Sequence, residues 1–177
     1  MNKKALYLFL ALALPGLIFV FLKFFGKNEF DVPVYYQAGL PQDSVCQVSA
    51  AVPYVVADSV FTKIGSRKQN VHRIVAVYPF VKDDLSELNR IAEKYRDDSV
   101  DIRILSGMPN LPKSNLPVTQ LTYDTFGWLV MCSLRVREPW SVVLLDDKNK
   151  IRGYYDGSRR DEMDRLDLEL SILLKKY

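Results

Sequence analysis

Two cysteines and one histidine are the side chains of this 177-residue sequence best suited to thiol or metal chemistry. Cys46 and Cys132 are 86 residues apart, so the chain has neither a C-x-x-C motif for thiol–disulfide exchange nor a local zinc motif. Three interpretations of the pair stay open: a structural disulfide formed outside the cytoplasm, two separate buried cysteines packed as small apolar groups, or a remodelled metal pair. His72 is a weak third metal candidate, because one imidazole cannot complete a metal site.

Other constellations that could do chemistry are explained by simpler roles. Asp146, Asp147 and Asp156 flank a predicted hairpin, but their spacing does not match a calcium-binding loop, and turn geometry already favours aspartate there. The sequence shows no Ser/His/Asp constellation, phosphate-cradling glycine loop or glycosidase-like pair of carboxylates, and its single histidine restricts acid–base catalysis. We therefore predict a protein that is not an enzyme and needs no resident cofactor.

The charge distribution excludes a nucleic-acid surface. The chain has a net charge of +3, but its first 29 residues hold four of the 24 basic groups and one of the 21 acidic groups. Residues 30–177 thus carry 20 groups of each sign and are formally neutral. Binding to nucleic acid requires clustered basic faces, which this composition does not offer.

The N-terminal residues predict a membrane anchor. A basic start is followed by 18 uncharged, mostly apolar residues at 5–22 and then by Lys23 and Lys27. In a helix these 18 residues would span about 27 Å, close to the hydrocarbon thickness of a bilayer. A cleaved signal peptide is the alternative, but the only A-x-A-like triplet, at residues 11–13, would leave another apolar stretch behind it. We expect residues 5–22 to contact membrane lipid as a single-pass anchor.

Three segments follow from this division: an anchor at residues 1–27, a linker at 28–45, and a folded domain at 46–177. Lysines flank both ends of the apolar run, so charge gives little guidance on orientation. The simplest arrangement places the N-terminus inside and the domain on the periplasmic side of the inner (cytoplasmic) membrane.

The order of predicted elements indicates an α/β domain of the thioredoxin-like class, with a central sheet flanked by helices. Residues 72–80 are the expected central strand, because they form a nearly continuous run of apolar and β-branched side chains. The further expected elements are one or two strands within 45–61, a turn at 65–70, a helix at 85–95, a strand at 101–105, a long loop at 106–117, a short helix within 122–134, a hairpin of 141–146 with 151–155, and a terminal helix that buries Met163, Leu166, Leu170 and Leu173.

The C-terminal third resembles the SCO/SenC family, in the sequences PWSVVLLD at residues 139–146 and KIRGYYDG at 150–157. The resemblance implies a membrane-anchored thioredoxin fold that handles copper or thiols during assembly of a terminal oxidase. The family's site combines a C-x-x-x-C pair at a strand-to-helix junction with a distant histidine. This chain reads FVKDD at residues 80–84 and has Trp140 at the histidine position, so no metal ligand can be carried over. Pro139 occupies the position of the cis-proline of thioredoxin-like folds.

These observations predict a non-catalytic, membrane-anchored, SCO/SenC-like protein that works by protein contact. Its expected partner is a membrane protein complex, either a respiratory terminal oxidase or another envelope complex, which it would serve as assembly factor or accessory subunit. The alternative is a thiol-redox or copper-handling protein that uses Cys46 and Cys132 in a rearranged site, with copper as its cofactor.

Overall fold

The computed structural model of the chain describes residues 3–25, 31–41, 45–46, 51–66, 68–78, 85–110, 113–139 and 141–175. It divides into two compact units, Met1–Asp31 and Val32–Tyr177. The first unit holds helix α1 (Lys3–Phe25). Among the residues that the structure describes, no helix is both long enough and apolar enough to cross a membrane, so they do not support the predicted span at 5–22.

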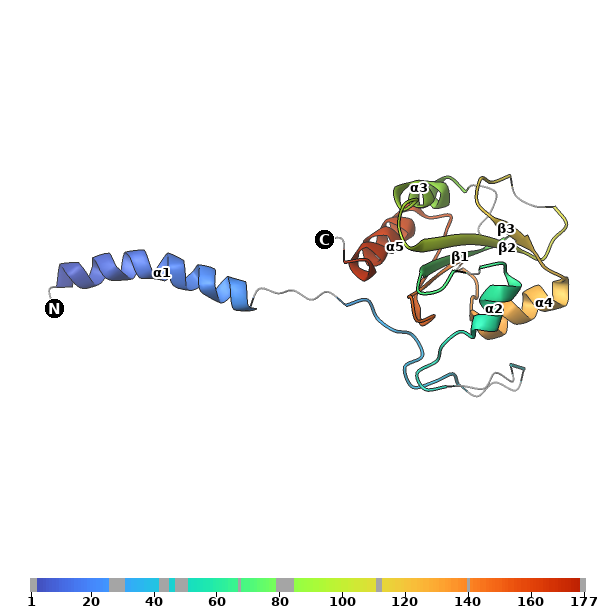
Figure 1. Ribbon diagram of the computed structural model, residues 1–177, viewed down its shortest axis with the longest axis horizontal. Helices are drawn as coiled ribbons and strands as arrows, with labels where there is room; N and C mark the ends of the chain where they lie inside the picture. Colours follow the sequence, from blue (N-terminus) through green and yellow to red (C-terminus); the bar gives the residue numbers. More distant parts are fainter. Residues whose placement is uncertain are drawn as a thin grey trace. The chain divides into compact units, whose positions relative to one another are not determined.

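The second unit is built on a five-stranded mixed sheet in the order β3-β2-β1-β4-β5. Figure 1 labels three of these strands, β1, β2 and β3. The strands are β1 (His72–Tyr78), β2 (Val100–Ser106), β3 (Val118–Gln120), β4 (Val142–Leu145) and β5 (Ile151–Tyr155). Strands β1, β2 and β3 pair in parallel, whereas β4 is antiparallel to both β1 and β5. A β-α-β unit followed by a hairpin and a terminal helix, with the first hairpin strand beside β1, is the thioredoxin-like arrangement.

Helices cover both faces of this sheet. Helices α3 (Ser86–Lys94) and α5 (Arg160–Leu173) pack on one face and share a core with the even-numbered positions of β1. On the other face lie α2 (Asp58–Lys63), α4 (Tyr123–Trp128) and a π-helical segment, η1 (Leu129–Ser133). The predicted central strand is confirmed for residues 72–78, because its five inner residues are buried between the two helical layers.

Two local predictions differ from the structure. Residues 45–61 were expected to contain strands, but their described part has none, and α2 begins at Asp58. The buried side chains Val60, Phe61 and Ile64 have helical spacing, and this periodicity outweighs the β-branched composition of the segment. Strand β3 was not predicted, because three residues are too few to show an alternating pattern.

The folded unit also begins earlier than the expected boundary at residue 46. Val32 is 2% exposed, and its carbonyl oxygen accepts a hydrogen bond from Arg152. The backbone N–H of Tyr35 donates to the carbonyl oxygen of Ile151 over 2.9 Å, and the Tyr35 ring packs edge-on against Tyr154. Apolar and aromatic side chains thus hold part of the predicted linker at 28–45 against the domain.

Candidate functional site

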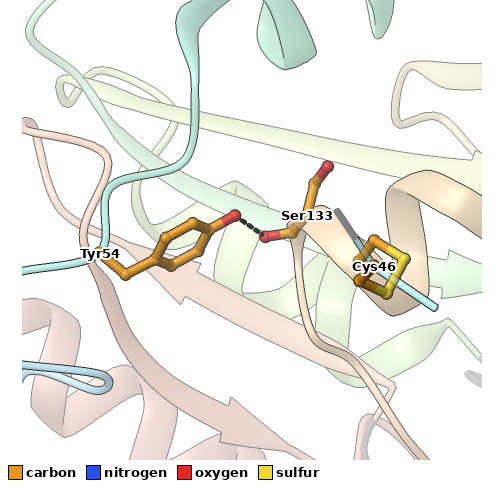
Figure 2. Close-up of a disulfide and its surroundings, with 4 residues drawn as sticks. Cys46, Tyr54 and Ser133 are labelled. Atoms are coloured by element: carbon orange, nitrogen blue, oxygen red, sulfur yellow. Dashed lines mark hydrogen bonds between the residues drawn. A yellow bond between two sulfur atoms is a disulfide. The ribbon is translucent and has the colours of Figure 1, made fainter. Parts of the chain in front are cut away.

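Cys46 and Cys132 are joined in a disulfide, with their Cα atoms 5.3 Å apart. Of the three interpretations left open by the sequence, the structure supports the disulfide. Figure 2 shows the disulfide. The two cysteines are 7% and 4% exposed, so the bond is buried. It connects the N-terminal part of the folded unit to a helical segment that lies 86 residues further along the chain.

The π-helical segment η1 positions Cys132. It continues α4 without a break, and the N–H of Leu134 donates to the carbonyl oxygen of Leu129 over 2.8 Å, which is the wider i to i+5 turn of a π-helix. The flanking side chains of Val130 and Ser133 are buried with Cys132. Single π-turns occur frequently at functional sites, and here the turn carries one half of the disulfide.

Two tyrosines bind the carbonyl groups where η1 ends. The Tyr54 hydroxyl donates to the carbonyl oxygen of Ser133 over 2.8 Å, beside the disulfide (Figure 2). The Tyr154 hydroxyl donates to the carbonyl oxygen of Leu134 over 2.9 Å. Burial raises the pKa of Tyr54 and that of Tyr154, so both phenols stay protonated as donors. These bonds satisfy carbonyl groups that the helical end leaves without an intrahelical partner.

While they are joined in the disulfide, Cys46 and Cys132 can act neither as nucleophiles nor as metal ligands, because a cysteine needs a free thiolate for either role. Neither cysteine of the chain is free. His72 starts β1, where burial lowers its pKa and the carboxylates of Asp147 and Asp146 oppose that shift. Within the described ranges, no three histidine, cysteine, aspartate or glutamate side chains are grouped closely enough to hold a metal ion.

Turn geometry engages two of the three acidic residues that flank the hairpin, Asp146 and Asp156. An Asp146 carboxylate oxygen accepts the backbone N–H groups of Lys148 and Lys150, each over 2.9 Å. An Asp156 carboxylate oxygen likewise accepts the N–H of Ser158 over 2.9 Å. Local backbone donors thus engage both carboxylates, and the other oxygen of Asp146 accepts a hydrogen bond from Arg152 over 3.2 Å.

The position that carries the metal site in the SCO/SenC family is only partly described. The peptide bond between Glu138 and Pro139 is cis, as the resemblance to thioredoxin-like folds implied. The junction at residues 80–84 and Trp140 lie outside the described residues.

Solved structures of the Sco and thioredoxin types resemble this chain at low identity. No protein-family model matches the chain, and no curated protein matches its sequence. BsSco, a member of the Sco family of cytochrome c oxidase assembly proteins, is 12% identical with a TM-score of 0.48, over 83% of this chain and 98% of that one. A SCO1/SenC family lipoprotein from Bacillus anthracis is 14% identical with a TM-score of 0.47, over 64% and 85% of the two chains.

The thioredoxin domain of a thiol-disulfide oxidoreductase from Bacteroides vulgatus is 15% identical with a TM-score of 0.47, over 58% of this chain and 80% of that one. Similarity at this level carries no argument about function. The thioredoxin-like fold of the chain rests on its strand order and connections.

Proposed function

We propose that this chain is a membrane-tethered, non-catalytic protein of the SCO/SenC type that works by protein contact. Its partner is a respiratory terminal oxidase or another envelope complex, for which it acts as assembly factor or accessory subunit. The buried Cys46–Cys132 disulfide carries the proposal, because it occupies both thiols of the chain as a structural tie. A thioredoxin-like domain without free thiols can still bind a partner through its surface, but it lacks the thiolates that copper binding or thiol exchange needs.

Exposed apolar side chains along α4 and η1 give the proposed contact a surface. Tyr123, Trp128 and Met131 are 82%, 44% and 54% exposed. The Lys63 ammonium group lies 5.7 Å from the centre of the Trp128 ring, where a cation–π contact restrains the indole. Exposed aromatic and methionine side chains of this kind are enriched in protein interfaces, and a subunit of the membrane complex is the occupant that we propose for them.

Purification of the affinity-tagged full chain after mild detergent extraction tests the proposal. We expect subunits of one membrane complex to co-purify in stoichiometric amounts, as identified by mass spectrometry. The double variant Trp128→Ala/Met131→Ala should reduce their recovery by at least roughly fivefold, because anchors of an interface typically contribute more than 1 kcal/mol each. Leu168→Ala is the matched control, since Leu168 is 61% exposed on α5, across the sheet. A chain that purifies alone would contradict the proposal.

The membrane tether in this proposal rests on the sequence of residues 5–22 and has its own test. We expect the full chain to sediment with membranes after an alkaline carbonate wash, and a chain that lacks residues 1–31 to stay in the supernatant. Release of the full chain by the wash would contradict the proposed membrane tether.

A rearranged copper or thiol site is the alternative function, and one observation favours it. The structure joins Cys46 to Cys132, which lies on the π-helical turn η1, so reduction of their disulfide would create two neighbouring thiols. Titration of the reduced full chain with Cu(I) separates the two functions. Tight binding of one equivalent would support the alternative and overturn the non-catalytic proposal, whereas weak binding without a defined stoichiometry supports a structural disulfide.

A further inference from the structure

A buried arginine lies at the start of the central strand, away from the residues of the disulfide site. Arg73 is the second residue of β1 and is 4% exposed. Its guanidinium group stacks on the Phe61 ring of α2, 4.3 Å from the ring centre. Burial lowers the pKa of Arg73, which means that the surroundings disfavour its charge. A buried cation normally has a carboxylate in direct contact.

The hydrogen bonds of Arg73 all go to neutral oxygen atoms. Its Nε donates to the Ser66 hydroxyl over 3.2 Å, and its Nη1 donates to the Val71 carbonyl and to the Asn149 side-chain oxygen over 3.3 and 2.5 Å. Its Nη2 donates to the Lys68 carbonyl over 2.5 Å. Arginine has five N–H groups, so one Nη2 N–H has no acceptor among the residues that the structure describes.

The nearest carboxylates are engaged with other donors. Asp101, beside Arg73 in the parallel register of β1 and β2, accepts the Ser66 hydroxyl and pairs with Arg103 over 3.0 Å. Asp58 accepts the side-chain amide of Asn149 over 2.7 Å. Each carboxylate is therefore separated from the guanidinium group by one intervening side chain.

Arg73 lines a cavity of about 570 Å³. Besides Arg73, its charged lining residues are Lys68, Lys148, Asp58 and Asp147, which leaves one positive charge in excess. Its volume lies within the range of about 300 to 1,000 Å³ that is typical of sites for small molecules. The cavity thus combines room for a ligand with a buried cation that retains a free donor.

We propose that this cavity is a binding site for a small organic ligand, which presents one oxyanion group, a carboxylate or a phosphate, to Arg73. Either group could accept a charge-assisted hydrogen bond from the remaining Nη2 N–H of Arg73. Asp58 and Asp147 repel additional negative charge, so the site selects ligands with a single anionic group and polar hydrogen-bond donors. This inference does not depend on the proposed contact function.

Equilibrium dialysis of the full chain in nonionic detergent tests the site directly. Radiolabelled acetate and radiolabelled inorganic phosphate serve as the two probes, at an ionic strength held constant with sodium chloride. We expect saturable uptake of one equivalent of at least one probe. Uptake of acetate alone assigns a carboxylate ligand, and uptake of phosphate alone assigns a phosphate ligand. Failure of both probes to bind saturably would overturn the proposal.

Exposed lining residues supply variants that should shift the dissociation constant in opposite directions. Lys148→Ala should weaken binding about two- to fivefold and Asp147→Asn should tighten it by a similar factor, as expected for partly screened charges. Lys150→Ala is the control, because Lys150 belongs to the same turn but does not line the cavity. Equal weakening by Lys148→Ala and Lys150→Ala would show nonspecific attraction and overturn the site.

The buried residue itself provides the strongest test. Arg73→Lys keeps the charge but removes the remaining Nη2 N–H, and we expect binding to weaken at least about tenfold, as for the loss of a charge-assisted hydrogen bond. If this variant does not fold, the opposite shifts of Lys148→Ala and Asp147→Asn still decide the question, because both side chains are exposed. Unchanged affinity in a folded Arg73→Lys variant would contradict the proposal.

Discussion

At the scale of single residues, one disulfide and neighbouring hydrogen bonds hold the candidate site together. The buried Cys46–Cys132 disulfide ties the N-terminal part of the folded unit to η1, and Tyr54 binds the carbonyl oxygen next to Cys132. In the entropic description, closing a loop of this length stabilises the fold by roughly 4 to 5 kcal/mol, because the unfolded chain loses freedom. The residues around the disulfide thus fit a structural tie.

Removal of the Tyr54 hydroxyl tests this arrangement. Tyr54→Phe deletes the 2.8 Å bond and leaves the buried carbonyl group of Ser133 without that donor. We expect the free energy of unfolding, measured by urea titration, to fall by about 1 to 2 kcal/mol. Tyr123→Phe is the control, since Tyr123 is 82% exposed and its variant should change stability by less than about 0.5 kcal/mol. Equal stability of the two variants would contradict the role of Tyr54.

Buried tyrosines also set the stability of the fold at alkaline pH. Burial raises the pKa values of Tyr54, Tyr154 and Tyr155 in the folded state above the value of about 10 in an unfolded chain. Above that pH the unfolded state releases protons that the folded state retains, so the free energy of unfolding should fall as the pH rises beyond about 10. Urea titrations between neutral pH and pH 11 would measure this fall, and constant stability across that range would contradict it.

The sequence left three interpretations of Cys46 and Cys132 open: a structural disulfide, two separate buried cysteines, or a metal pair. Cys46 and Cys132 are brought together by the packing of η1 against the N-terminal segment, and no local pattern records a contact across 86 residues. Arg73 was missed for a related reason, since it interrupts an apolar strand without any motif around it. A charged residue at the start of a buried strand is the signal that could have identified it.

At the scale of elements, local periodicity predicted the central strand, the helix that follows it, the hairpin and the terminal helix. These elements are confirmed as β1, α3, β4 with β5, and α5. The failures are α2 and β3, of six and three residues, because such short segments do not repeat their pattern. The π-turn η1 was expected only as helix, since its sequence resembles that of an ordinary helical turn.

Two glycines give a matched test of the described elements. Gly127 lies in α4, and a Cβ atom there would meet nothing within 4 Å, so Gly127→Ala should stabilise the fold by about 0.5 to 1 kcal/mol. In β5 a Cβ atom at Gly153 would collide with the phenol of Tyr155, whose hydroxyl donates to Glu169 over 2.5 Å. We expect Gly153→Ala to destabilise the fold by about 1 to 3 kcal/mol. Thermal unfolding of both variants checks these opposite signs, and shifts in the same direction would contradict this packing.

At the scale of the whole molecule, the folded unit begins at Val32 and uses part of the expected linker in its packing. Removal of residues 1–31 should therefore leave its melting temperature unchanged. Removal of residues 1–41 exposes the surface that Val32 covers and deletes one of the hydrogen-bond acceptors of Arg152, so we expect a loss of about 2 to 4 kcal/mol. Calorimetry of the two truncated chains measures this difference, and equal melting temperatures would place the boundary beyond residue 41.

The central claim is that the Cys46–Cys132 pair is a structural tie and that the protein works without thiol chemistry. Alkylation of the full chain, followed by measurement of its mass, tests it most directly. We predict no adduct on the native chain, with or without glutathione, because both cysteines are buried, and two adducts after denaturation with a strong reductant. Two adducts on the native chain in glutathione alone would show an accessible redox pair and contradict the claim.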